Sequence, residues 1–379
     1  MVGQRRLSIK GVTPLFFVIF AFVWWSVEAR TKTEKFSHAP ATLKFIHVVF
    51  RHGDRTQEGS YPTDPYQNNT FYPIGMGQLT NPGKIREYNI GRYLRKTYTG
   101  LIPEIYTPDV LRAISSPVPR CRASLQLVLA GLFPPIGPLK WNDNLNWNPI
   151  PYDYNPQAQD LLFWAFSNCP NYFTLMSEYR QSQAYRDVYA PHNEVLRYLM
   201  EKSGLTPSPY GVALMLYSTL RSQQDWGLTL PKWTETVWPE PITQITKLDW
   251  QQLFPTSETR AVGAGFLMSR IINETRLVLN RNRTVNGLRV SLYSGHDLNI
   301  AAILSWLGTP DIHVPQYGSF IIFEIHEIFR IPFIRIVHQN YEPGGPQVVE
   351  IPNCGFYCPF ATFVELYRVY TNRADICYG

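Results

Sequence analysis

Cysteine is scarce in this chain: its 379 residues include only five, and no two of them form a Cys-x-x-Cys pair of the kind that binds structural zinc. Internal repeats and low-complexity tracts are also absent. Charged residues make up only 17% of the sequence, and the basic excess is mild and unclustered, so we do not expect a nucleic-acid partner. Apolar residues make up 45%, an ordinary share that allows the chain to bury a core.

One apolar run resembles a targeting segment, and it lies at residues 12–27, after the basic residues Arg5, Arg6 and Lys10. The run ends in small residues and is short for a membrane span of about 20 residues. These features are typical of a secretory signal peptide, so we predict one over residues 1–29, with a retained membrane anchor as the alternative. Its removal lowers the formal charge from +6 to +4, because the leader contains three basic residues and one acid.

The cysteines fit an oxidising compartment. Cys354 and Cys358 are close enough in the sequence for a local disulfide. Cys377 lies beside the C-terminus, and pairing it with Cys169 would hold down an end that otherwise frays. Cys121 is then the odd thiol, and we expect a small buried apolar residue there rather than a reactive one.

Three Asn-x-Thr sequons, at Asn68, Asn273 and Asn282, are candidate glycosylation sites. Each is weak alone. Together with the predicted leader they indicate a secreted protein, either extracellular or in the lumen of a lysosome-like compartment, with no stable membrane span once the leader is cleaved.

Two segments are expected to be strands that end in polar residues. Residues 43–50 are rich in β-branched and aromatic side chains and run directly into the polar stretch 51–55, Arg-His-Gly-Asp-Arg. Residues 288–293 run into Ser-Gly-His-Asp at 294–297, and an apolar helix pattern follows over 298–307. Ligands of open α/β sheets bind beyond the carboxyl ends of strands. If the two strands are parallel neighbours, both polar stretches share one pocket.

Such a pocket is suited to a tetrahedral anion. The guanidinium groups of Arg51 and Arg55 can grip its oxygens, while Gly53 lets the backbone turn tightly beside it. His52 lies between the two arginines and can attack the central atom of the anion. Asp297, on the second strand, can protonate a leaving alkoxide. This combination predicts phosphoryl transfer by covalent catalysis on histidine.

The stretch 51–56 resembles the Arg-His-Gly-x-Arg signature of the histidine acid phosphatases, and it is most similar to the prostatic, lysosomal and insect venom branch. The stretch 293–297 resembles the second motif of that family. Phytase-like relatives tend to carry His-Ala-Glu at the second motif, so Asp297 argues against a phytase. The resemblance covers nearly the whole mature chain and extends through residues 77–80, 132–135, 228–233 and 354–359.

The resemblance implies an α/β fold in which helices flank a mixed, mainly parallel sheet, as in phosphoglycerate mutase. It also implies a core domain formed by residues 30–152 and 254–379, with a smaller helical domain inserted at 153–253. The sequence is compatible with this division, because helix-like runs such as 193–202 and 210–226 replace strand-like runs within the insert.

The resemblance also assigns roles to the site residues. His52 would form the phosphohistidine, and Asp297 would protonate the leaving oxygen of a phosphate monoester. Arg51, Arg55 and His296 would hold the phosphate oxygens, without a metal or another cofactor. Because Asp297 must be protonated to donate, an acidic optimum is expected. The family often forms dimers, so a homodimer is a further possibility.

The chain departs from the family pattern near its second predicted phosphate-binding segment. The resemblance places a third phosphate-binding arginine at the position of Ile114, and an aspartate at Pro117. Arg112 lies two residues earlier, on the same face of a strand and about 6–7 Å further back, and is one candidate substitute. Arg120, which retains a later arginine of the family, is the other. Gln57 replaces a proline of the first motif.

These departures leave three functions open. We favour an active, though reduced or specialised, phosphatase, because both charged motifs are intact. The alternative is a secreted pseudo-phosphatase that binds an anion or a partner without turnover, as the loss of a phosphate-binding arginine at Ile114 suggests. A mutase-like transferase shares the histidine chemistry, but the leader and the cysteines argue against it.

Overall fold

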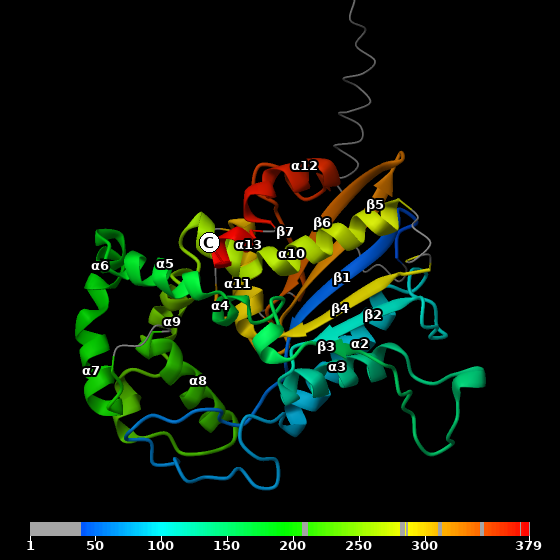
Figure 1. Ribbon diagram of the computed structural model, residues 1–379. Helices are drawn as coiled ribbons and strands as arrows, with labels where there is room; N and C mark the ends of the chain where they lie inside the picture. Colours follow the sequence, from blue (N-terminus) through cyan, green and yellow to red (C-terminus); the bar gives the residue numbers. More distant parts are fainter. Residues whose placement is uncertain are drawn as a thin grey trace, which may run out of the picture.

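The structure is a computed structural model (Figure 1), and eight strands of its described residues form one sheet at the centre. The structure describes residues 39–206, 211–280, 285, 287–309, 313–341, 345–371 and 373–378. The predicted signal peptide and the sequon at Asn282 lie outside these residues. Asn68 and Asn273 are both exposed. No described helix is both long and apolar enough to cross a membrane.

The sheet has the order β3-β2-β4-β1-β5-β6-β7, and β8 pairs with β6. Strands β3, β2, β4 and β1 are mutually parallel, whereas β5 pairs with β1 in the antiparallel sense and the remaining pairs are antiparallel. The predicted α/β class with a mixed sheet is confirmed. The strands are β1 Leu43–Arg51, β2 Leu111–Ser115, β3 Asp153–Tyr154, β4 Val290–Gly295, β5 Phe320–Ile328, β6 Ile331–Gln339, β7 Gln347–Val349 and β8 Cys358–Pro359.

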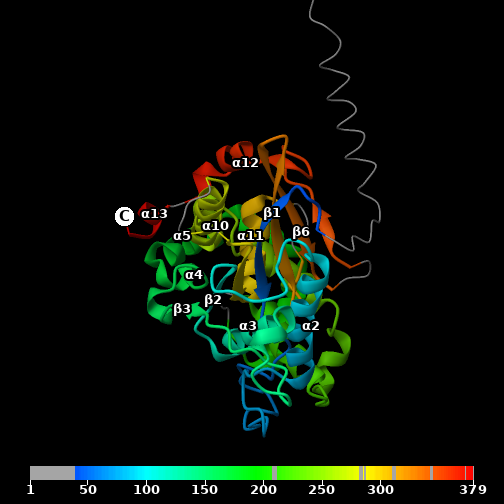
Figure 2. The same cartoon turned by 90° about the vertical axis from the view of Figure 1, so that its right-hand side faces the viewer.

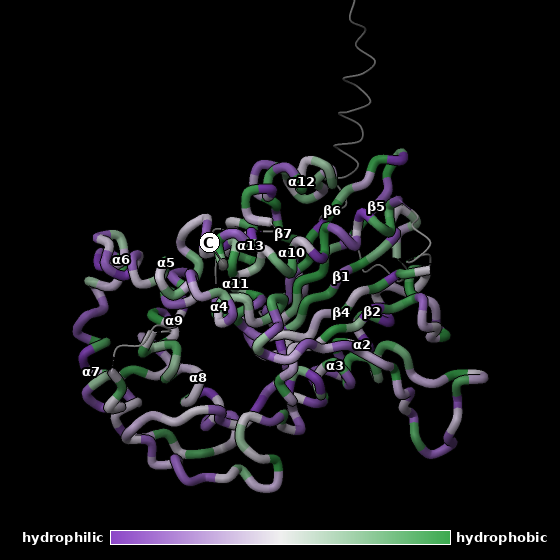
Figure 3. The backbone as a smooth tube through the Cα atoms, in the orientation of Figure 1, coloured by the Kyte–Doolittle hydropathy of each residue, from purple (hydrophilic) through white to green (hydrophobic). Residues whose placement is uncertain are grey.

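Strand β1 is buried on both faces, which explains its nearly continuous apolar sequence. Successive side chains of a strand point to opposite faces. Phe45 and Val49 therefore pack with helices α10 (Ser257–Leu279) and α11 (Asp297–Leu307) on one face. Ile46 and Val48 pack with α2 (Asn81–Thr97) and α3 (Pro119–Leu132) on the other. Figures 1 and 2 show these two helix layers on either side of the sheet, and the strands at its centre are hydrophobic along most of their length (Figure 3).

Helices supply both outer layers and a separate lobe. The longer helices are α2 Asn81–Thr97, α3 Pro119–Leu132, α5 Pro170–Arg180, α7 Asn193–Ser203, α8 Val212–Asp225, α9 Ile242–Gln251, α10 Ser257–Leu279 and α11 Asp297–Leu307. The shorter helices are α4 Ala165–Asn168, α6 Gln183–Tyr189, α12 Phe360–Leu366 and α13 Ala374–Tyr378, and the 3₁₀ turns lie at Gly137–Leu139, Gln157–Gln159, Ala190–His192, Lys232–Thr236 and Arg368–Tyr370.

The lobe at the left of Figure 1 contains helices α6 to α9. Helices α7, α8 and α9 bury a small core of their own, to which Tyr61 from the segment after β1 also contributes. Helices α4 and α5 instead pack into the core beside α10. The helical character expected for residues 153–253 is therefore present, while the division into two domains stays a prediction.

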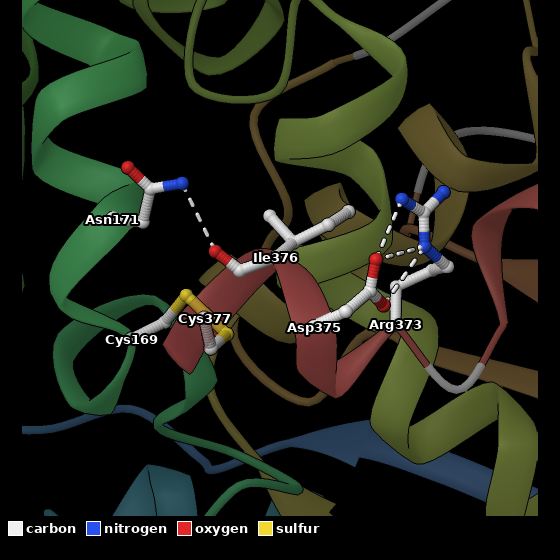
Figure 4. Close-up of a disulfide and its surroundings, with 6 residues drawn as sticks. All are labelled: Cys169, Asn171, Arg373, Asp375, Ile376 and Cys377. Atoms are coloured by element: carbon white, nitrogen blue, oxygen red, sulfur yellow. Dashed lines mark hydrogen bonds and ion pairs between the residues drawn. A yellow bond between two sulfur atoms is a disulfide. The ribbon is translucent and has the colours of Figure 1, made fainter. Parts of the chain in front are cut away.

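The cysteines lie in the two pairs that the sequence indicates. Cys169, before α5, is bonded to Cys377 in α13, with an S–S distance of 2.20 Å (Figure 4). The Asn171 side chain donates to the Ile376 carbonyl across the same junction at 3.0 Å. Cys354 and Cys358 form the local pair. Cys121 is the free and fully buried cysteine among the described residues.

Candidate active site

The two polar stretches meet where β1 and β4 end. The strands are parallel neighbours, and their register pairs Arg51 with Gly295 at the last position of each. The backbone N–H of His52 continues this pairing by donating to the Gly295 carbonyl at 3.1 Å. His52 and His296 therefore leave adjacent strands at the same edge, and their ring centres are 5.7 Å apart. Both strand ends point toward the helical lobe (Figure 1).

One ring nitrogen of His52 is hydrogen-bonded to the backbone. Its Nδ1 lies 2.9 Å from the carbonyl oxygen of Gly53, which can only accept, so Nδ1 carries the hydrogen. Its Nε2 therefore keeps a lone pair. Burial is the main factor that lowers the pKa of His52 well below its ordinary value, and the charges of Arg120 and Arg51 lower it further. Burial and the neighbouring charges thus favour the neutral imidazole, whose free Nε2 is its nucleophilic atom.

The turn after His52 depends on a close approach between two backbones. A Cβ atom on Gly53 would lie 2.6 Å from the carbonyl oxygen of Gly83 in the first turn of α2. A Cβ on Gly83 would in turn lie 2.2 Å from the carbonyl oxygen of Asp54. Asp54 is held against the same helix by Arg86, whose Nε donates to it at 2.6 Å. The loop that follows β1 is thus fixed against α2 by contacts that only glycine permits.

Two arginines of the first motif are buried beside His52. Arg51 pairs with Asp297 at 2.8 Å and lies over the ring of Tyr317, with 4.1 Å to its centroid. Arg55 donates to Ser218 at 2.9 Å and to Ser222 at 3.3 Å, both on α8. The helical lobe therefore helps to place one of the predicted phosphate-binding groups.

A third arginine reaches the site from the first turn of α3. Arg120 is 6% exposed, and among the neighbouring charges it has the largest effect on the pKa of His52. The Nε atoms of Arg51, Arg55 and Arg120 are all buried without a hydrogen-bond partner among the described residues. A buried donor without a partner is costly, so three of them around one histidine favour an anion as ligand.

Asp297 is the first residue of α11 and faces Arg51 across the site. Burial alone would raise the pKa of its carboxyl group. The charges of Arg51, His296 and Arg55 together with the Leu298 backbone hydrogen bond outweigh burial, so that this pKa lies below its ordinary value. The Asp297 side chain is 28% exposed, and a proton can therefore reach it from solvent.

His296 is held by a chain of hydrogen bonds. The Trp164 indole N–H donates to the Ser116 hydroxyl at 3.0 Å, so the Ser116 hydrogen remains available for Nε2 of His296 at 2.9 Å. Burial lowers the pKa of His296 to about 3, and the charge of Arg120 acts in the same direction. Trp164 also packs edge-on against this ring.

Arg112, one of the two candidate substitutes for a lost phosphate ligand, does not reach the strand ends where the site lies. It pairs in register with Ser291, four residues before the ends of the strands, and this places it roughly 13 Å behind them. Its guanidinium donates to Glu274 of α10 at 2.7 Å. Ile114 lies in the apolar core on the same face. The third cation of the site is Arg120, which approaches from a helix and not along the strand.

Gln57 takes part in a buried network that the sequence did not reveal. Its side-chain amide donates to Asp64 at 2.6 Å and accepts from Gln223 of α8 at 3.0 Å. Gln223 also donates to Asp64 at 2.9 Å. The residue at the position of the family proline therefore ties the loop after Arg55 to the helical lobe.

Sequence analysis also missed Glu58, Tyr317, Ser218 and Ser222. Glu58 lies three residues after Arg55, and this proximity to the motif was a signal that could have identified it. The other three lie more than 160 residues from the first motif, and no local pattern marks them.

Comparisons with known proteins identify the family of the chain. Residues 42–339 match the model of the histidine phosphatase superfamily (branch 2). The chain is 34% identical to venom acid phosphatase Acph-1 of Apis mellifera, over 89% of this chain and 88% of the relative, and 30% identical to prostatic acid phosphatase of Homo sapiens, over 95% and 91%. The fold is similar to that of Hafnia alvei phytase in complex with tartrate, with a TM-score of 0.66 and 18% sequence identity. The match covers 89% of this chain and 99% of the phytase chain. The chain therefore belongs to the histidine phosphatase superfamily.

Proposed function

We propose that this chain is a secreted acid phosphatase that hydrolyses phosphate monoesters through a phosphohistidine at His52. The observation that carries the proposal is the environment of this histidine. Its ring is neutral and held by Gly53, and three buried guanidinium groups with unpaired N–H donors surround it. A neutral nucleophile within a cationic pocket is what attack on a phosphate monoester requires.

In the first step the phosphate oxygens bind to Arg51, Arg55 and Arg120. Nε2 of His52 attacks the phosphorus, and a phosphorus–nitrogen bond forms as the bond to the leaving oxygen breaks. Asp297 gives its proton to that oxygen, which departs as an alcohol. In the second step Asp297 accepts a proton from water, the water oxygen attacks the phosphorus, and the bond to His52 breaks to release inorganic phosphate.

The acidic optimum follows from the pairing of Asp297 with Arg51. In the free enzyme this pairing lowers the pKa of Asp297, so that the carboxylate is charged. A bound phosphate brings negative charge to Arg51 and weakens its hold on Asp297, which makes the carboxylate more basic. Asp297 then takes up the proton that the first step needs, and proton uptake is easier at lower pH.

The pseudo-phosphatase alternative depended on a missing cation at Ile114. Arg120 argues against it, because a third guanidinium lies beside His52 without any contribution from Ile114 or Arg112. Secretion is proposed from the predicted leader, the two disulfides and the exposed sequons at Asn68 and Asn273.

The test is hydrolysis of an aryl phosphate between pH 4 and 7, with rapid-quench mass spectrometry of the protein. We expect turnover with an acidic optimum, and a loss of about 10⁴-fold or more in kcat/KM for His52→Ala. Asp297→Asn should slow both steps and leave phosphate on His52 when a good leaving group is supplied. His192→Ala, in the helical lobe, is the matched control. A folded wild type that binds phosphate without turnover would contradict the proposal.

A further inference from the structure

The carboxylate of Glu58 bridges two of the three site arginines. Its Oε1 lies 2.8 Å from Nη1 of Arg120, and its Oε2 lies 3.4 Å from Nη2 of Arg55. The arginine side chains are almost fully buried, whereas the Glu58 side chain is 49% exposed. Glu58 is therefore an anion at the rim of the site that contacts groups which we assign to the substrate phosphate.

From this geometry we propose that Glu58 is a specificity-determining residue, which competes with the substrate phosphate for Arg55 and Arg120 and selects against substrates with additional negative charge. The inference rests on the proposed function, because it takes these arginines as phosphate ligands. A phosphate oxygen and a carboxylate oxygen need the same guanidinium N–H groups, so one must give way to the other.

Glu58 is free to give way. The described contacts of its carboxylate are those with Arg55 and Arg120 alone, and half of the side chain faces solvent. Gly59 follows it, and a Cβ added at Gly59 would meet no atom within 4 Å, so the chain next to Glu58 is uncrowded. Rotation about the side-chain bonds can therefore carry the carboxylate into water without disturbing a packed core.

Arg55 does not depend on Glu58 for its position. Its guanidinium also donates to the Thr56 carbonyl at 3.0 Å and to the hydroxyl groups of Ser218 and Ser222. Arg120 is fixed at its base, because it lies in the first turn of α3 and is almost fully buried. Displacement of Glu58 thus leaves both cations in place for the incoming phosphate.

The remaining charge of Glu58 also acts on the rest of the substrate. A displaced carboxylate stays attached at the rim, where it repels a second anionic group on the leaving alcohol and attracts a cationic one. Since the interaction passes partly through solvent, its effect is modest and falls with salt. The expected order of preference is a cationic leaving group, then a neutral one, then an anionic one.

The first measurement is the affinity for inorganic phosphate, by calorimetry at fixed pH and ionic strength, in the wild type and in Glu58→Gln. This affinity needs no turnover. We expect Glu58→Gln to bind phosphate about three- to tenfold more tightly, and Glu58→Asp to resemble the wild type. Glu365→Gln is the matched control, because it removes a carboxylate on remote α12 that pairs with Arg368.

The second measurement is kcat/KM for phosphoethanolamine, phenyl phosphate and 3-phosphoglycerate. Glu58→Gln should raise kcat/KM most for 3-phosphoglycerate and least for phosphoethanolamine, mainly by lowering KM. Weaker phosphate binding in Glu58→Gln would overturn the inference, since Glu58 would then serve to position the arginines. Unchanged affinity and unchanged preference would overturn it as well. Absence of turnover in every variant would refute the proposed function alone, while the phosphate affinities would still decide the role of Glu58.

Discussion

Two clusters of the same residue types lie along β1 and β4, one at the strand ends and one roughly 13 Å behind it. In the inner cluster Glu274 receives hydrogen bonds from Arg112, Ser291 and Tyr293 at 2.6–2.9 Å, and it lies 3.6 Å from His47. In the outer cluster three arginines keep buried N–H groups without partners. The same types of side chain therefore form a structural centre where every polar group has a partner. They form a binding site where some buried donors have none.

Charge alone does not distinguish the binding site from the structural cluster. Arg112 and Arg120 both lie near β2 in the sequence, and sequence reasoning could not choose between them. Their partners distinguish them. Arg112 forms an ion pair with the buried carboxylate of Glu274, whereas Arg120 pairs with Glu58, which is half exposed and displaceable.

The largest expected effect contrasts these two arginines. Arg120→Ala should lower kcat/KM for an aryl phosphate by about 10²- to 10³-fold, because a desolvated donor to the phosphoryl group is lost. Arg112→Ala, which removes the same charge from the inner cluster, should lower it less than about tenfold. Steady-state kinetics at the pH optimum decides, and equal losses in the two variants would break the distinction between the clusters.

The second effect is on stability, and here the inner cluster should matter more than the outer one. Glu274→Gln should lower the free energy of unfolding by about 2–4 kcal/mol, since it removes one partner from a buried charged network. Asp297→Asn should change it by less than about 1 kcal/mol, because the Asp297 side chain is partly exposed and its cluster is not fully paired. Urea denaturation at pH 7 measures both. A larger loss for Asp297→Asn would show that the outer cluster is the structural one.

The smallest effect concerns pH. Burial lowers the pKa of His47 in the inner cluster to about 4, although Glu274 acts in the opposite direction. An unfolded histidine titrates near pH 6.5, so between these values the unfolded chain binds the additional proton and stability falls as the pH falls. At pH 5 the loss from His47 is about 2 kcal/mol relative to neutral pH. Urea titrations at pH 7, 6 and 5 should show a shallower loss in His47→Gln, and an unchanged slope would exclude His47 as the cause.

Much of the fold could be predicted because its signals are local. The apolar run of β1 reflects burial on both faces, and its expected bounds of 43–50 differ from the observed strand by one residue. The second strand was expected at 288–293, whereas β4 begins and ends two residues later, because the pairing with β1 extends through Ser294 and Gly295. The helix expected at 298–307 begins at Asp297.

The site could be predicted only in part, for a physical reason. Arg51 ends β1, His52 follows it, and Asp297 lies two residues after the end of β4, so strand pairing was enough to bring them together. Its position on a strand made Arg112 a candidate, whereas Arg120 reaches His52 from helix α3, which begins after that strand. Tyr317 arrives through tertiary packing, which no spacing in the sequence encodes.

The Cys169–Cys377 bond also determines what a single proteolytic cut can do. The two cysteines are 208 residues apart, and His52 precedes this interval while His296 and Asp297 lie within it. A cut anywhere between residues 170 and 295 places His52 on one fragment and its two partners on the other. Because the disulfide joins the fragments, the nicked chain migrates as one species until it is reduced, and the two halves of the site cannot diffuse apart.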